Sequence, residues 1–167
     1  MDSPERFWHF LGISLFFLLA AIHRWTRSKG IFIAAIWNLS GVILHELAHL
    51  SVGILLKAEP VGFSLIPHKT PTGWRLGTVS FRRINAFNAV PVALAPLCLA
   101  GTAFIIYRSW SLWFPPTLSS TICLYVTMFI LLYNALPSLQ DLKIACNLKS
   151  MLLYGTTAAT IFWLSQQ

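Results

Sequence analysis

His45-Glu46-Leu47-Ala48-His49 lies inside the apolar stretch from Ile31 to Leu56, and both the fold and the chemistry expected of this chain follow from it. In a helix, residues four apart share a face, with Cβ atoms about 5–6 Å apart. The two imidazoles can therefore reach one Zn²⁺ at roughly 2.0–2.1 Å each. Glu46 follows about 100° round the helix, where it can address a water on that ion without being a ligand. Each ionisable side chain in a membrane helix costs about 2.5–3.5 kcal/mol, which favours a metal site over chance polar core residues.

The composition predicts that lipid surrounds this motif. The chain has 167 residues, of which 56% are hydrophobic and 10% charged, whereas a soluble domain carries roughly 25% charged residues. Its mean hydropathy is +0.68. We expect an all-α multi-pass transmembrane bundle of about five membrane helices, forming one membrane-embedded domain over residues 1–167 with its core at about 31–143. The expected spans are Phe7–Ile22, Ile31–Leu56, Phe87–Tyr107, Leu118–Leu136 and Ser150–Leu164.

The net charge of +7 does not indicate nucleic-acid binding, because the basic residues lie in short connections between apolar stretches. With five crossings, eight Lys and Arg residues share a side with the N-terminus, and four lie on the other side, three of them in the loop His23–Gly30. Cytoplasmic loops are rich in Lys and Arg, so this count predicts that the N-terminus and the active site face the cytoplasm.

The polar connection from Lys57 to Asn85 predicts a small β-hairpin, either re-entrant or at the membrane surface. Val61–Leu65 and Trp74–Leu76 alternate apolar and polar residues with a period of two, and Gly77 is expected to shift that alternation as a bulge would. An extended substrate could add to the edge of this hairpin as a strand. The alternative is an ordinary amphipathic hairpin on the membrane surface.

A catalytic zinc needs a third protein ligand, and Asp141 is the strongest candidate. His45 lies about 21 Å into its stretch at 1.5 Å per residue. The stretch from Leu118 runs in the same direction, and Pro137 shortens its reach, so Asp141 is expected at the same level. The alternative is a helix-end carboxylate at the membrane surface. The other candidate ligands, which lie in tails, loops or distant parts of spans, are Asp2, Glu5, His9, His23, Glu59 and His68.

Together these segments resemble the site-2-protease family of intramembrane zinc metalloproteases. That family carries H-E-x-x-H on one membrane helix and an N-x-x-P…D segment on a later one, which Asn134-Ala135-Leu136-Pro137 followed by Asp141 resembles. The resemblance implies that His45, His49 and Asp141 bind zinc and that Asn134 orients the substrate. It also implies hydrolysis of single-span membrane proteins near the cytoplasmic side.

Other functions fit the residues less well. CAAX-processing peptidases use a downstream Glu as third ligand, and this chain has no Glu after Glu59. Membrane desaturases need several histidine boxes, which five His residues do not supply. A transporter is expected to show internal repeats, which are absent from this sequence. The principal alternative is a catalytically silent zinc-binding membrane scaffold or chaperone, and the retained Glu46 argues against it.

Overall fold

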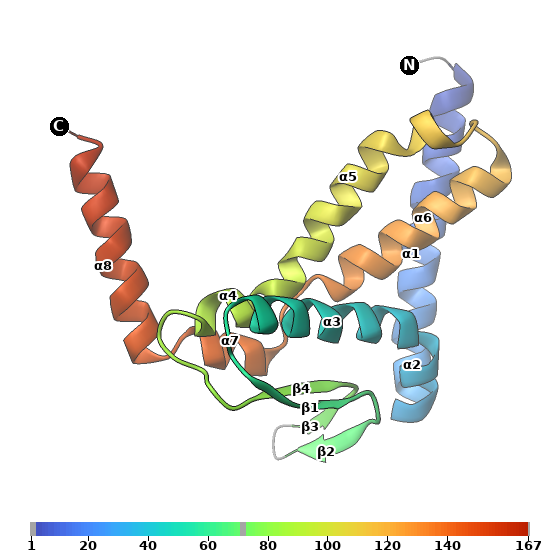
Figure 1. Ribbon diagram of the computed structural model, residues 1–167. Coiled ribbons are helices and arrows are strands. Elements are labelled where there is room, and N and C mark those ends of the chain that lie inside the picture. The colour runs from blue at the N-terminus through green and yellow to red at the C-terminus, as the bar shows by residue number, and fades with distance from the viewer. Residues whose placement is uncertain (1–2, 71–72, 167) are drawn as a thin grey trace.

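The computed structural model describes residues 3–70 and 73–166, which are mostly helical (Figure 1). The helices are α1 (Ser3–Lys29), α2 (Ile31–Trp37), α3 (Leu39–Leu55), α4 (Ala89–Ala93), the 3₁₀ helix η1 (Ala95–Leu97), α5 (Cys98–Trp113), α6 (Leu118–Asn134), α7 (Leu139–Ala145) and α8 (Leu148–Leu164). The strands are β1 (Pro60–Ser64), β2 (His68–Thr70), β3 (Gly73–Arg75) and β4 (Thr78–Phe81).

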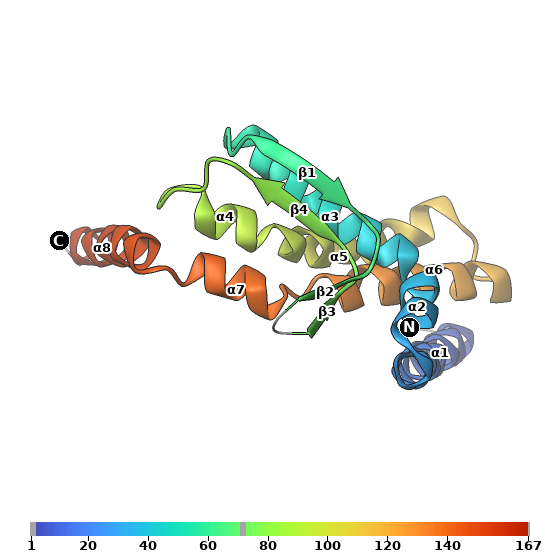
Figure 2. The same ribbon diagram turned by 90° about the horizontal axis from the view of Figure 1, so that it is seen from below.

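Helix α6 is the centre of the packing, because both α1 and α5 lie against it. Between α5 and α6 a small core contains Leu99, Ala103, Leu131 and Ala135. Alanine at two of these positions lets the helix backbones approach closely, as is usual where lipid supplies no hydrophobic driving force between helices. α8 stands apart from this bundle (Figures 1 and 2), and Ser150 is its one buried residue.

The expected span Ile31–Leu56 is two helices, α2 and α3, bent by 77° at Asn38. Asn38 leaves helical geometry (φ −103°, ψ 17°), and its side chain bonds to Asn134 on α6 instead of facing solvent. The expected loop His23–Gly30 is also different. α1 continues to Lys29, and the chain turns at Gly30, whose φ of 138° only glycine adopts readily.

Prolines account for the other breaks. The expected span Phe87–Tyr107 is divided into α4, η1 and α5, with Pro91 and Pro96 in the first two, where a proline ring removes a helical donor. α6 ends at Asn134 before Pro137, and α7 then departs at 52°.

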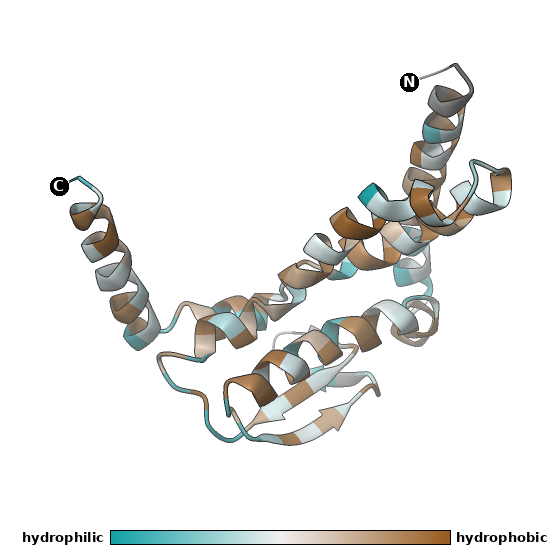
Figure 3. Ribbon diagram, turned by 45° about the horizontal axis from the view of Figure 1, so that its top comes forward, coloured by the Kyte–Doolittle hydropathy of each residue, from teal (hydrophilic) through white to brown (hydrophobic). Residues whose placement is uncertain are grey.

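These breaks reduce the number of clear membrane helices. Within the described residues one helix, Phe7–Lys29, is long and apolar enough to cross a membrane, and three are if each bent pair counts as a single span. The prediction of five such helices is therefore wrong by this measure, although the largely helical class is confirmed. Apolar residues recur along α3, α5 and α6 (Figure 3), and large side chains such as Leu112 and Leu136 are exposed.

The strands pair differently from the predicted hairpin. β1 is antiparallel to β4, with Phe63 opposite Val79, and β2 is antiparallel to β3. The residues from Gly73 to Arg75, predicted to pair with Val61–Leu65, pair instead with β2, which is closer in the sequence. The next segment, Thr78–Phe81, pairs with β1. The register irregularity lies between Pro60 and Gly62 and not at Gly77.

The two chain ends lie at the end of the molecule away from the strands (Figure 1). The count of Lys and Arg residues predicts that the N-terminus and the hairpin share a side, because it takes the segment from Ile31 to Leu56 as crossing the membrane. Because of the 77° bend, α3 runs across the direction of α1 and does not return the chain toward the N-terminus. The end of α1 and the strands therefore lie at one common end.

Candidate metal centre

Three side-chain donors converge where α3, α6 and α7 meet. His45 and His49 project from α3, and their Nε2 atoms are 3.2 Å apart. Asp141 Oδ2 lies 3.6 Å from His45 Nε2 and 3.5 Å from His49 Nε2. These three residues could hold a metal ion, and they are buried or nearly so.

Main-chain carbonyl groups fix the orientation of both imidazoles. His45 Nδ1 is 2.8 Å from the Asn134 carbonyl oxygen, and His49 Nδ1 is 2.7 Å from that of Val92. A carbonyl only accepts, so each Nδ1 carries the proton and donates. In the neutral rings both Nε2 atoms are then acceptors whose lone pairs face one another. A metal ligand of this kind characteristically donates its other ring N–H to such a partner.

Asp141 is fixed by the start of its own helix. Ser138 is the N-cap of α7, and its hydroxyl accepts from the Asp141 N–H at 3.2 Å. In return Asp141 Oδ2 accepts from the Ser138 N–H at 2.7 Å, which completes a capping box. The oxygen that faces the histidines is thus held by the backbone.

The spacing of the donors fits a tetrahedral ion. With bonds of about 2.0–2.1 Å, neighbouring ligands around tetrahedral zinc lie about 3.3 Å apart. The three observed separations, 3.2, 3.5 and 3.6 Å, are close to this value. The two Asp141 distances exceed the 2.7–3.2 Å of an N–H···O hydrogen bond. A cation would also offset the two buried carboxylates, Glu46 and Asp141.

Glu46 lies beside the three donors, with 6% of its surface exposed. It lines two cavities of about 230 and 240 Å³, the first shared with His45 and Asn134 and the second with His49 and Asp141. Residues Thr78 to Phe81 of β4 line the second cavity. At Gly77 a Cβ atom would overlap the Glu46 and Val42 side chains, so a larger residue there would displace this carboxylate.

Asn134 contacts the centre through its backbone. Its side-chain amide donates to the Asn38 side chain and to the Ile130 carbonyl, and its Oδ1 accepts from Asn38 at 2.7 Å. The side chain is therefore engaged within the protein, although Asn134 also lines the cavity next to His45. A Cβ atom at Gly41 would overlap this amide pair.

The other candidate ligands lie elsewhere. Glu59 pairs with Arg83 at 2.9 Å, His9 contacts the Tyr125 hydroxyl, and the His23 ring packs against Tyr133. Asp2 is outside the described residues, as are the side chains of Glu5 and His68.

Three residues that support the centre were not predicted from the sequence: Asn38, Val92 and Ser138. The role of Ser138 could have been predicted, because Ser138-Leu139-Gln140-Asp141 carries the S-x-x-D pattern of a capping box. The roles of Asn38 and the Val92 carbonyl could not have been predicted from a local pattern, since their contacts join segments far apart in the chain.

No family model, curated protein or solved structure matches the chain.

Proposed function

We propose that the chain is an intramembrane zinc metalloprotease that hydrolyses peptide bonds of membrane-protein substrates near the cytoplasmic side of the membrane. The observation that supports it best is the convergence of His45, His49 and Asp141 beside the buried Glu46. Two imidazoles and a carboxylate leave a fourth tetrahedral position open, as in catalytic zinc sites.

The residues divide the reaction between them. Bound to the three ligands, zinc would lower the pKa of a water molecule and polarise the scissile carbonyl group. Glu46 accepts a proton as the water oxygen attacks that carbonyl carbon, and it returns the proton to the amine as the C–N bond breaks. The Asn134 and Val92 carbonyls hold the imidazoles in the tautomer that presents Nε2.

The strand β4 supports a peptide as the substrate. It lines the cavity that contains Glu46, His49 and Asp141, and among the described residues it pairs with β1 alone. A peptide bond inside a helix is shielded by its own turn, so a protease must hold its substrate extended. An added strand at the open edge of β4 would have its backbone groups satisfied without water.

The basic residues support a cytoplasmic orientation of the centre. Ten of the twelve Lys and Arg residues belong to segments at the strand end of the molecule, and Arg6 and Arg108 belong to segments at the other end (Figure 1). This asymmetry is larger than the eight to four of the five-crossing count, because Arg24, Arg27 and Lys29 in the last turns of α1 now belong to the strand end. The chain ends would then face away from the cytoplasm.

The test combines zinc content with cleavage of a model single-span substrate by the purified chain. We expect about one zinc per wild-type chain, and loss of zinc in His45→Ala and Asp141→Ala. Glu46→Gln should retain the zinc and lose cleavage by a factor of at least about 10², because an amide cannot accept the proton.

Glu59→Gln is a suitable control, since that carboxylate lies in an ion pair outside the centre. Zinc without cleavage in the wild type would favour the silent scaffold. Full zinc content in Asp141→Ala would remove Asp141 from the site.

A further inference from the structure

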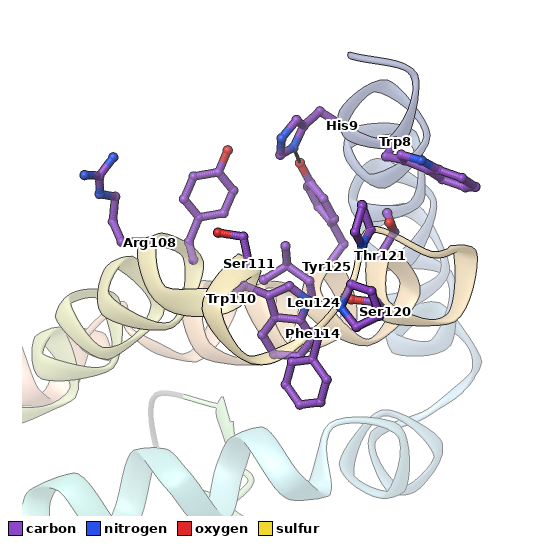
Figure 4. A pocket seen from close by; sticks show the side chains of 13 residues that line it. Trp8, His9, Arg108, Trp110, Ser111, Phe114, Ser120, Thr121, Leu124 and Tyr125 are labelled. Carbon is purple, nitrogen blue, oxygen red and sulfur yellow. Dashed lines mark hydrogen bonds between the residues drawn. The ribbon is translucent and has the colours of Figure 1, made fainter. Parts of the chain in front are cut away.

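A cavity of about 380 Å³ lies far from the metal centre. Helices α1, α5 and α6 form its walls (Figure 4). It is lined by Thr121 near the start of α6, whereas Asn134 at the end of α6 contacts His45. At 1.5 Å per residue these two positions on α6 are about 20 Å apart. The cavity is therefore separate from the proposed active site.

The polar groups of this cavity favour an anion. Arg108 is exposed, and no described carboxylate lies within ion-pair distance of it. Tyr107 and Ser111 lie within one turn of it on α5, and His9 faces the cavity from α1, where its Nδ1 is 3.0 Å from the Tyr125 hydroxyl (Figure 4). None of the thirteen lining residues is acidic, so the Arg108 charge and several hydrogen-bond donors have no anionic partner among the described residues.

The remaining wall is aromatic and apolar. The Trp110 and Phe114 rings are 4.5 Å apart between centroids, and Trp110 Nε1 donates to Ser120 Oγ at 2.8 Å, which fixes the indole. Leu124 is buried behind them. A ligand that fits this cavity carries an anionic group next to an apolar part.

The position of the cavity, at one end of a helix that could cross a membrane, favours a lipid among ligands with an anionic group and an apolar part. It adjoins the N-terminal end of α1, the one described helix that by itself is long and apolar enough to cross a membrane. Tryptophan, tyrosine and arginine at the end of a membrane helix are typical of the headgroup level of a bilayer. Arg108 is also one of only two Arg or Lys residues in segments at this end of the molecule.

We propose that this cavity binds an anionic phospholipid, with Arg108 on the phosphate and Trp110 and Phe114 against the start of an acyl chain. No carboxylate of the described residues lines the cavity, which disfavours headgroups that carry an ammonium group. The proposal rests on insertion of the chain into a membrane and not on its being a protease.

The experiment measures thermal unfolding of the detergent-purified full chain with added phosphatidylglycerol, phosphatidylcholine or inorganic phosphate. Phosphatidylglycerol should raise the unfolding temperature most. Arg108→Gln should weaken its apparent affinity about tenfold or more, which is the usual effect of losing a hydrogen bond to a charged group. Arg108→Lys should keep most of the affinity, and Arg82→Gln, an exposed change at the strand end, should keep all of it.

Equal stabilisation of wild type and Arg108→Gln by phosphatidylglycerol would overturn the proposal. Equal effects of phosphatidylcholine would overturn the choice of an anionic headgroup, and equal effects of phosphate alone would overturn the choice of a lipid. Should Arg108→Gln fail to fold, Ser111→Ala takes its place. It should weaken the apparent affinity for phosphatidylglycerol by a smaller factor. An unchanged affinity in Ser111→Ala would then overturn the proposal.

Discussion

Asn38 and Asn134 form a closed pair of side-chain hydrogen bonds, with both amide groups buried. The pair fixes the start of α3 against the end of α6, where the Asn134 carbonyl orients His45. The site-2-protease resemblance implies a substrate-orienting role for Asn134, whereas its contacts favour a role in positioning His45, a candidate metal ligand.

We expect Asn38→Ala and Asn134→Ala to have similar effects, because each leaves the other amide buried without its partner. Either change should cost about 1–3 kcal/mol of unfolding free energy and weaken zinc binding. The double variant should cost much less than the sum of the two. Chemical denaturation and zinc titration measure both quantities. A raised KM in Asn134→Ala alone, with normal stability, would show instead that the side chain contacts the substrate.

At the scale of elements, α7 is a helix of seven residues whose first turn carries the candidate ligand Asp141. Ser138→Ala removes the hydroxyl of the capping box. It should destabilise the helix by about 1 kcal/mol and weaken zinc affinity by up to about 10–100-fold, as is typical for partners of metal ligands. Competition with a zinc chelator measures this affinity.

Thr117→Ala provides the matched control for that change. Thr117 caps α6 through the Ser120 N–H at the same 3.2 Å, at the end of α6 away from the metal centre. Its loss should lower stability by a similar amount and leave zinc affinity unchanged. Equal zinc affinities in the two variants would mean that the capping box does not position Asp141.

The edge of β4 can be tested with two prolines. Neighbouring strand residues direct their N–H groups to opposite edges, so Val79→Pro and Ser80→Pro remove donors from different edges. One change should disrupt the pairing with β1 and lower stability. The other should leave stability and zinc content unchanged but reduce cleavage. Normal cleavage by the variant that keeps its stability and its zinc would exclude strand addition at β4.

Features of the fold and the metal centre that depend on local spacing could be predicted from the sequence. Features that depend on contacts between distant segments could not. The positions of His45 and His49 follow from helical spacing, and Asp141 followed from its place after Pro137. The bend at Asn38 carries no proline or glycine and depends on an amide 96 residues away. The pairing of β4 with β1 likewise depends on which segments meet, because Trp74–Leu76 alternates as convincingly as the true partner of β1.

At the scale of the whole molecule, the bend between α2 and α3 leaves the end of α1 and the strands at one end of the molecule. Most Lys and Arg residues belong to that end, which favours its facing the cytoplasm. We expect Thr70→Cys, in a background without the three native cysteines, to resist an impermeant thiol reagent in intact cells. Ser119→Cys, at the start of α6, should react. The reverse pattern would put the metal centre on the outer side of the membrane.

The ligand candidates lie on α3 and α7, and about ninety residues of chain separate His49 from Asp141. An ion held by both would act as a cross-link between the two halves of the sequence. Closing a loop of that length in the unfolded chain removes conformational entropy equivalent to about 4–5 kcal/mol in the simplest chain model. The metal would thus contribute to the thermodynamic stability of the fold as well as to catalysis. A chelator should accordingly lower the unfolding temperature of the wild type and have little effect on that of Asp141→Ala.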